Sequence, residues 1–288
     1  MEKSYTYNAY AKINIALEVL DKREDGYHNL KMIMQKISLC DKLTFSKNNK
    51  KEINIHSDVH ISNKEDNLIY KSIMALSKAS DKEIYVDVTV DKKIPKEAGL
   101  GGGSSDCATT LIAINEMFNL SFSINELEKI GAKLGADVPY CLHNETMIAE
   151  GIGDILTPIK DMPPCYILVV KPTVGVETKF VFQNFKVEDI QKRPNFEKLL
   201  EAFETRDITL VSRELCNNLE DVTLKLYPEV SDVKKIILNN HCINALMSGS
   251  GSTVFGIFND LYEAKKCQDE LEKSSVSLEF LDIFTPIN

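Results

Sequence analysis

The sequence predicts an α+β protein of 288 residues, on three observations. Stretches in which apolar and polar residues alternate, typical of half-buried strands, are interspersed with stretches in which apolar residues recur every three or four positions, typical of helices. The chain is long enough for one or two domains. A stretch with three prolines, residues 154–164, separates two halves that each contain both patterns. We therefore expect two mixed domains, residues 1–160 and 161–288.

Strands are predicted where the alternation is bounded by turn residues. The clearest case is residues 12–19, in which Ile13, Ile15, Leu17 and Val19 would share one face and Lys12, Asn14, Ala16 and Glu18 the other. A turn around Gly26 follows this strand. The remaining strands are expected at 35–45, 84–90, 166–170 and 278–284, with a hairpin at 243–258.

Helices are predicted where apolar residues share one face at helical spacing. They are expected at 68–76, 107–118, 123–134, 196–204, 207–219, 229–239 and 263–272. Capping boxes formed by Ser62 with Glu65 and by Ser123 with Glu126 mark the starts of the first and third helices. The second helix is expected to be capped by Ser104, Ser105 and Asp106.

The charge and the cysteines restrict the class of protein. The formal net charge is −9, which disfavours non-specific binding to nucleic acid or to an anionic membrane but permits a small anionic ligand. The seven cysteines are dispersed without any C-x-x-C pair, so zinc and thioredoxin-like sites lack their signature and a reducing compartment is favoured. No leader or membrane-spanning segment is visible, so we expect a cytoplasmic protein. The sequence leaves the oligomeric state open.

A glycine-rich segment between a predicted strand and a predicted helix is the most informative feature. Gly99, Gly101, Gly102 and Gly103 lie within five residues. Such a turn directs backbone N–H groups and the positive end of a helix toward one point, which forms an anion site. A bare structural turn is the alternative. A Walker loop is excluded because the chain has no Gly-Lys dipeptide, and Ser104 stands where a dinucleotide-binding motif needs its third glycine.

Three segments carry a family resemblance that spans most of the chain. The string IPKEAGLGGGSSD (residues 94–106) resembles the phosphate loop of the GHMP kinases, although Glu97 and Cys107 depart from the family pattern. The segments AYAKINIALEV (9–19) and ALMSGSGSTVFGIF (245–258) are similar to the N-terminal and C-terminal motifs of that superfamily. The resemblance implies a two-domain GHMP kinase fold with the active site in the interdomain cleft.

Four further segments are similar to GHMP kinases whose acceptor carries a cytidine diphosphate. They are REDGYHNL (23–30), KEDNLIY (64–70), GADVPY (135–140) and EGIGDILTP (150–158). The resemblance implies that ATP phosphorylates a tertiary hydroxyl of a cytidine-diphosphate-bearing methylerythritol in the non-mevalonate isoprenoid pathway. Two other functions stay open: another GHMP kinase, of the homoserine or mevalonate type, and a non-catalytic nucleotide sensor on the same fold.

The resemblance also implies a set of site residues. Lys12 and Asp137 would be catalytic, with Asp137 accepting the proton of the acceptor hydroxyl or acting electrostatically with Lys12. Mg²⁺ is expected with ATP, and Ser105 is a possible contact. Substrate would be bound by Asn14, Tyr27, His28, Phe182, Gly249 and Gly251, with Tyr27 and Phe182 stacking on the cytosine. ATP would be bound by Pro95, Lys96, Glu97, Ala98, Gly99, Leu100, Gly101, Gly102, Gly103, Ser104 and Ser105, and its adenine by Asn67 and Leu68.

Each of these residues has a structural alternative. Lys12 could be a solvated charge, Asp137 a helix cap and Phe182 a core residue. Asn67 and Leu68 could simply begin a helix, and Gly249 and Gly251 could serve only a tight hairpin. His56 and His60 have a metal-like spacing, but in a segment that reads as strand and loop, so a metal site there is disfavoured.

Overall fold

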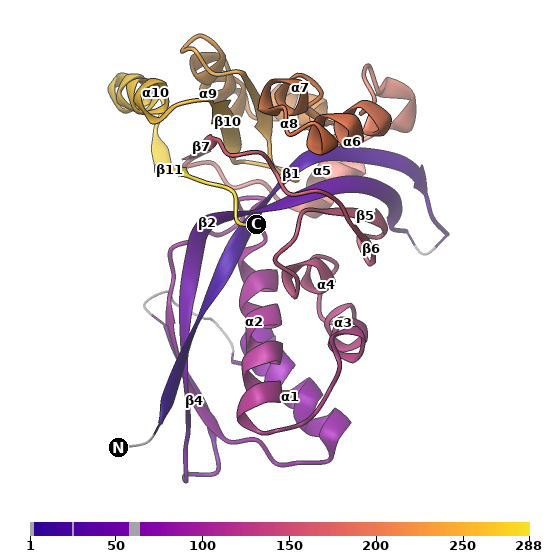
Figure 1. The fold of residues 1–288 in the computed structure, drawn as a ribbon, viewed down its shortest axis with the longest axis vertical. Helices are drawn as coiled ribbons and strands as arrows, with labels where there is room; N and C mark the ends of the chain where they lie inside the picture. Colours follow the sequence, from indigo (N-terminus) through magenta and orange to yellow (C-terminus); the bar gives the residue numbers. More distant parts are fainter. Residues whose placement is uncertain (1–2, 25, 58–63) are drawn as a thin grey trace. The chain divides into compact units, whose positions relative to one another are not determined.

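The computed structural model describes residues 3–24, 26–57 and 64–288 (Figure 1). Runs of strands and runs of helices follow one another along the chain, and most strand pairs are antiparallel, which confirms the predicted α+β class. Close contacts group the described residues into two compact units, each assembled from separate segments. Unit 1 comprises residues within 1–11, 39–94 and 101–143, and unit 2 comprises 12–38, 95–100 and 144–288. The boundary expected near residue 160 stays a prediction.

A long hairpin of two strands runs through both units. Strands β1 (Ser4–Lys22) and β2 (His28–Lys47) are 19 and 20 residues long. Apolar residues on one face of β1 are fully buried, as the alternation predicts, but the polar residues on its other face are buried too. Because burial of polar groups costs free energy unless they are paired, this second face is a candidate for function.

Unit 1 contains the β3–β4 end of the first sheet and a group of helices. Strand β4 (Val86–Asp91) pairs antiparallel with β2 and parallel with β3 (Ile53–Ser57). Helices α1 (Leu68–Ser80) and α2 (Gly102–Met117) lie side by side (Figure 1), and α2 also packs on α3 (Ile124–Gly131) and α4 (Val138–Cys141). A short 3-10 helix, η1 (Lys64–Asp66), precedes α1. Ile73, Leu76, Leu111 and Ile114 are fully buried, as their helical spacing predicts.

Unit 2 contains the other part of the long hairpin and a second sheet. Strand β5 (Met147–Gly151) pairs with β2 and with β6 (Ile155–Pro158), and the short β8 (Cys216–Asn217) pairs parallel with β1. The second sheet is antiparallel, in the order β11-β7-β10-β9. Its strands are β7 (Tyr166–Pro172), β9 (Asn244–Met247), β10 (Val254–Phe258) and β11 (Leu278–Phe284).

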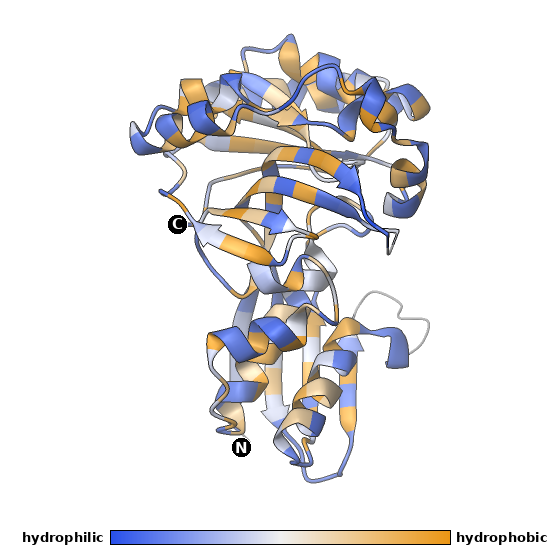
Figure 2. Ribbon diagram, turned by 90° about the vertical axis from the view of Figure 1, so that its right-hand side faces the viewer, coloured by the Kyte–Doolittle hydropathy of each residue, from blue (hydrophilic) through white to orange (hydrophobic). Residues whose placement is uncertain are grey.

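The helices of unit 2 carry hydrophobic and hydrophilic residues together, as Figure 2 shows. Helices α9 (Pro228–Leu238) and α10 (Leu261–Lys273) pack on the second sheet, and their buried residues, such as Val233, Ile237 and Leu271, recur at helical spacing. The others are α5 (Thr178–Asn184), η2 (Val187–Asp189), α6 (Phe196–Glu204), α7 (Ile208–Arg213) and α8 (Glu220–Leu226). In the described part of the chain, no helix combines the length and the apolar character needed to cross a membrane.

Three local predictions are wrong. The helix expected at 207–219 ends at Arg213, because Cys216 and Asn217 pair with Ala16 and Leu17 of β1. The connection expected at 154–164 contains β6, since β5 supplies a backbone partner that periodicity cannot reveal. Helix α2 is not capped by Ser104, Ser105 or Asp106: it begins earlier, at Gly102.

One of the two predicted capping boxes is confirmed. Ser123 and Glu126 form the predicted box at the start of α3, with the Ser123 backbone N–H donating to Glu126 Oε2 at 2.8 Å. Ser62 lies outside the described residues, and α1 is capped instead by Asn67.

Candidate functional site

The first half of the glycine loop (residues 95–105) lies against the turn that joins β9 and β10. Gly99 has φ +70°, and a Cβ there would come within 2.1 Å of the backbone oxygen of Ser248. The Ser248 hydroxyl donates to the Gly99 carbonyl at 3.0 Å, which fastens the two segments together. Gly99 is therefore required both by its positive φ and by the close approach of backbone.

Gly249 takes part in the same contact. It has φ +58°, and a Cβ there would lie 3.3 Å from the Gly99 Cα. Gly251, with φ +92°, instead lies beside Met247 and Thr223. Strands β9 and β10 do form the predicted hairpin. A role for these two glycines toward substrate stays a prediction.

The second half of the loop forms the N-terminus of α2. Gly101 is the N-cap residue, with φ +68°, and no side chain makes a capping hydrogen bond there. The helix is 16 residues long, and its N-cap glycine has no side chain to cap it, so its first backbone N–H groups form a positive end. This arrangement is suited to binding an anion, whereas a turn with a purely structural role would not need an open helix N-terminus.

A buried hydroxyl lies in the first turn of α2. Ser105 is 1% exposed, and its Oγ has no hydrogen-bond partner among the described residues. An unpaired buried hydroxyl costs free energy, and a ligand at this helix end would supply its partner. The structure therefore fits the prediction that Ser105 contacts a bound ion or phosphate, which stays a prediction.

Lys12 and Asn14 form a buried polar pair on the second face of β1. Lys12 is 4% exposed, and its Nζ donates to Asn14 Oδ1 at 2.9 Å. The Lys12 backbone N–H donates to the Leu100 carbonyl of the glycine loop, also at 2.9 Å. The alternative that Lys12 is a solvated charge is therefore wrong. Within unit 2, strand β1 presents a cation directly beside the loop.

Asp137 precedes α4 in unit 1. It is the N-cap residue of that helix, as the structural alternative predicts, but its side chain makes no capping hydrogen bond there, so the cap position alone does not account for the carboxylate. A Cβ on the nearby Gly135 would lie 3.7 Å from Ser104 Oγ, which brings this turn next to the start of α2. Lys12 belongs to unit 2, so the expected convergence of Lys12 and Asp137 stays a prediction.

Asn67 and Leu68 do begin a helix, which confirms the structural alternative given for them. Asn67 Oδ1 accepts the backbone N–H of Ile69 at 2.8 Å, and Leu68 is the first residue of α1. A Cβ on Gly103 would lie 3.5 Å from Leu68 Cδ1, so the start of α1 adjoins the glycine loop within unit 1. An adenine site at these residues stays a prediction.

Aromatic rings gather where β2 begins. The rings of His28 and Phe182 are stacked, with centroids 5.1 Å apart and an interplanar angle of 26°, and Phe185 meets His28 edge-on. Phe182 is half-buried, whereas its neighbour Val181 is fully buried, so Val181 rather than Phe182 fills the core. Tyr27 is 63% exposed. Burial, and secondarily the charge of Lys22, lower the pKa of His28, which favours its neutral ring.

A buried group of three charges, which no sequence motif indicates, lies beside the glycine loop. The Lys92 ammonium lies between the carboxylates of Asp41 and Asp106 and donates to Asp106 Oδ2 at 2.7 Å. Asp41 Oδ1 also accepts the backbone N–H groups of Lys93 and Ile94, at 2.6 and 2.8 Å. Burial raises the pKa of the Asp106 carboxyl to about 7, against the opposing effect of Lys92. The triad fixes the chain that enters the loop to β2 and to α2.

The two departures from the phosphate-loop pattern are accommodated. Glu97 is exposed, with φ +50°, so its charge can be solvated. Cys107 is buried, and its sulfur accepts a hydrogen bond from the Ser72 hydroxyl at 3.2 Å. Burial raises the pKa of the Cys107 thiol to about 11, so the thiol is neutral and inert.

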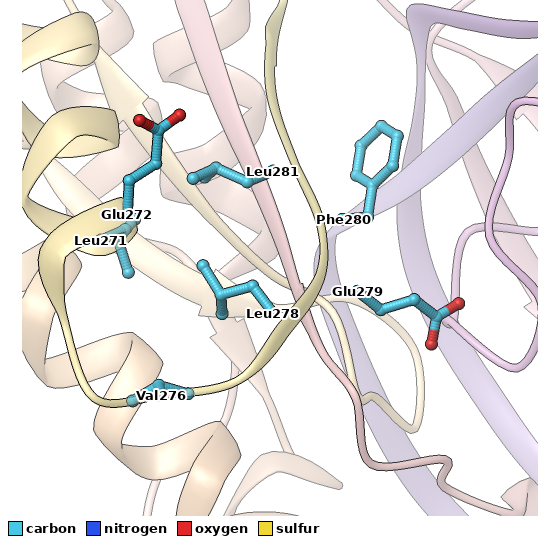
Figure 3. A pocket seen from close by; sticks show the side chains of 7 residues that line it. All are labelled: Leu271, Glu272, Val276, Leu278, Glu279, Phe280 and Leu281. Atoms are coloured by element: carbon cyan, nitrogen blue, oxygen red, sulfur yellow. The ribbon is translucent and has the colours of Figure 1, made fainter.

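Away from the glycine loop, one hollow contains none of the predicted site residues. A hollow of about 330 Å³ lies between α10 and β11, where Leu278 and Leu281 extend on one side of the strand and Glu279 and Phe280 on the other (Figure 3). Among the described residues, no group of three His, Cys, Asp or Glu side chains could hold a metal ion. His56 is exposed, and His60 lies outside the described residues.

Comparisons with known proteins agree with this geometry. Family models described as the GHMP kinases N terminal domain and the GHMP kinases C terminal match residues 67–145 and 199–276. A curated 4-diphosphocytidyl-2-C-methyl-D-erythritol kinase from Lachnoclostridium phytofermentans is 44% identical over 259 residues, which is 90% of this chain and 89% of the relative. One of the same name from Lachnospira eligens is 40% identical over 287 residues, or 99% and 100% of the two chains. This chain belongs to the 4-diphosphocytidyl-2-C-methyl-D-erythritol kinase family.

Solved structures confirm the GHMP kinase fold. A crystal structure of 4-(cytidine 5'-diphospho)-2C-methyl-D-erythritol kinase has a TM-score of 0.83 and 29% identity, and the match covers 99% of this chain and 100% of that one. A homoserine kinase from Cytophaga hutchinsonii has a TM-score of 0.75 at 18% identity, with 99% and 95% of the chains covered, which shows a shared fold alone. The family membership confirms the resemblance inferred from the motifs, while the roles of single residues stay predictions.

Proposed function

We propose that this chain transfers a phosphoryl group from ATP to the tertiary hydroxyl of 4-diphosphocytidyl-2-C-methyl-D-erythritol, in the synthesis of isoprenoid precursors. The observation that carries the proposal is the identity of 40–44% with curated kinases of that name over at least 90% of the chain. The site geometry supports it, because the chain offers an anion site, a buried cation and a group of aromatic rings.

Phosphate binding is assigned to the glycine loop and α2. The positive φ of Gly101 directs the chain into α2, and as a glycine it has no side chain to cap the first N–H groups of that helix. These donors suit the phosphate oxygens of ATP, and they need no Lys or Arg in the loop. The buried Lys12 ammonium, whose backbone is bonded to Leu100, would add positive charge where the transferred group passes.

The residues present are compatible with a Mg²⁺ ion for which the protein would supply few ligands and the phosphate oxygens of ATP would supply the others. The buried Ser105 Oγ has no partner among the described residues and would serve as a protein ligand, and the same residues offer no three-residue acidic or histidine cage. When bound, Mg²⁺ neutralises charge that develops on the β and γ phosphate oxygens. Phosphoryl transfer mainly requires such neutralisation and positioning.

The acceptor hydroxyl loses a proton during the transfer. We assign Asp137 to accept that proton at its carboxylate, or to act with Lys12 as a fixed charge that orients the hydroxyl. Asn14 Oδ1 accepts from Lys12 Nζ at 2.9 Å, which holds the ammonium in one position. Because the Asn14 side chain is fully buried, it can hold Lys12 without competition from water.

Recognition of the acceptor is assigned to the rings near the start of β2. Exposed Tyr27 offers a face for cytosine, and Phe182 offers a second ring that in this structure stacks on His28. The neutral ring of His28 can donate or accept one hydrogen bond at the base edge. A homoserine kinase and a mevalonate kinase share this fold at 18% and 14% identity. Identity this low shows a shared fold and does not indicate a shared substrate.

One experiment tests the proposal. The protein is incubated with ATP, Mg²⁺ and a panel of acceptors that contains 4-diphosphocytidyl-2-C-methyl-D-erythritol, methylerythritol 4-phosphate, homoserine and mevalonate, and ADP release is followed. ADP release with the first acceptor alone is expected. Turnover of homoserine or mevalonate would indicate another GHMP kinase, and nucleotide binding without turnover of any acceptor would indicate a sensor.

A further inference from the structure

The segment formed by α5 and the connection to α6, residues 178–195, is docked on the β1–β2 hairpin within unit 2. At its beginning, Phe182 and Phe185 contact the ring of His28. At its end, Arg193 Nη1 donates to Glu18 Oε1 at 2.7 Å. The next helix then starts with Phe196, whose ring lies under the Lys31 ammonium, 4.9 Å from its centroid. The segment is thus held on both strands of the hairpin.

The central contact of this docked segment is an ion pair with one buried partner. The side chain of Glu18 is 11% exposed and that of Arg193 is 46% exposed. Glu18 lies on the same face of β1 as Lys12 and Asn14, at the two-residue spacing of a strand. A carboxylate that is mostly removed from water needs a specific partner, and Arg193 supplies it from the docked segment.

A second set of bonds fixes the backbone next to Arg193. The carbonyl of Lys192 accepts from Asn218 Nδ2 at 2.8 Å, and Asn218 Oδ1 in turn accepts the backbone N–H of Val19 at 3.2 Å. Asn218 therefore links the docked segment to the residue of β1 that follows Glu18. The backbone of the residue that precedes Arg193 is therefore held beside the strand, which keeps the guanidinium within reach of Glu18.

We infer that Glu18 and Arg193 are positioning residues for the cytidine-binding rings, through the segment that carries Phe182 and Phe185. The pair ties this segment to the strand that also carries Lys12 and Asn14, so the ring that faces His28 has a fixed place relative to the phosphorylation chemistry on β1. The inference rests on the proposed function, which assigns cytosine to Tyr27, His28 and Phe182. It adds a specificity contribution from two residues that act through the cytidine-binding rings.

The test compares Arg193→Gln with Lys192→Gln. Both variants remove one positive charge from the same segment, but only Arg193 pairs with Glu18. For Arg193→Gln we expect the KM for the cytidine acceptor to rise about three- to tenfold, the size that corresponds to loss of a partly exposed charge pair. The KM for ATP should stay unchanged, and kcat should change less than twofold. Lys192→Gln should leave all three constants near those of the wild type.

Two further measurements separate positioning from simple stability. The charge-reversed double variant Glu18→Arg with Arg193→Glu should restore part of the acceptor KM, and hydrogen exchange in residues 178–196 should accelerate in Arg193→Gln only. Equal rises of the KM for ATP and for the acceptor, or no rise in a correctly folded variant, would overturn the inference. If the wild-type protein fails to phosphorylate the cytidine acceptor, the proposed function itself is wrong, which is a distinguishable result.

Discussion

Replacing Lys92 by methionine should destabilise the protein far more than replacing an exposed lysine. The Lys92 side chain is 14% exposed and lies between Asp41, which is fully buried, and Asp106, which is 9% exposed. Removal of the ammonium leaves two buried carboxyl groups without their cation. Loss of one partner from such a buried group typically costs about 3–5 kcal/mol, which is a large part of the roughly 5–15 kcal/mol by which domains are stable.

The assay is urea unfolding at neutral pH, with Lys235→Met as the matched control. Lys235 pairs with Asp232 at 2.9 Å, but both side chains are more than half exposed, so the expected loss is at most about 1 kcal/mol. Adding Asp106→Asn to Lys92→Met should recover part of the loss, because Asp41 still accepts two backbone N–H groups while the second charge is gone. A Lys92→Met variant as stable as the control would refute the account of the triad.

Three further predictions concern the chemistry and the acceptor. Asp137→Asn and Lys12→Ala should lower kcat by about 10²–10⁴-fold with an unchanged circular dichroism spectrum, whereas wild-type rates would remove both residues from the chemistry. Tyr27→Ala should weaken acceptor binding by about 1–3 kcal/mol, measured as a rise in the acceptor KM, and an equal rise for ATP would contradict base stacking. The pKa of His28 is lowered in the folded protein, so its contribution to stability is present above about pH 6.5 and is lost as the pH falls through the folded pKa. His28→Gln should therefore reduce the slope of the unfolding free energy against pH below about pH 6.5. An unchanged slope would exclude His28 as the group that titrates.

The sequence predicts much of the fold because local patterns and long-range contacts agree over most of the chain. Helix α6 spans residues 196–204 as expected, since its apolar spacing matches the face that it buries. The predicted helix at 207–219 fails for the opposite reason. Its second half satisfies its backbone on β1, nearly 200 residues away in sequence, and no local pattern carries that information.

The glycine loop was predictable, but its surroundings were not. Consecutive glycines between a strand and a helix indicate an anion site from the sequence alone. The contact of Gly99 with Ser248 joins residues far apart in the chain, so only the structure reveals it. The same holds for Asp106, which the sequence presents as a helix cap and the structure places in a buried ion triad. A charged residue reads as solvated unless its burial is known.

The alternation in β1 gave a correct strand and an incomplete account of its polar face. A two-residue period correctly separates Ile13 and Ile15 from Lys12 and Asn14. It does not tell whether the polar side faces water. The structure buries Lys12, Asn14 and Glu18, and that burial distinguishes a functional face from an ordinary solvated one.

The central claim is the transfer of a phosphoryl group to the tertiary hydroxyl of the cytidine-bearing acceptor. Phosphorus NMR of the product formed from ATP and 4-diphosphocytidyl-2-C-methyl-D-erythritol tests it most directly. The account predicts one new phosphomonoester resonance, on the tertiary carbon, with both diphosphate resonances retained. A phosphate on a primary or secondary hydroxyl, or release of inorganic phosphate without a phosphorylated acceptor, would contradict it.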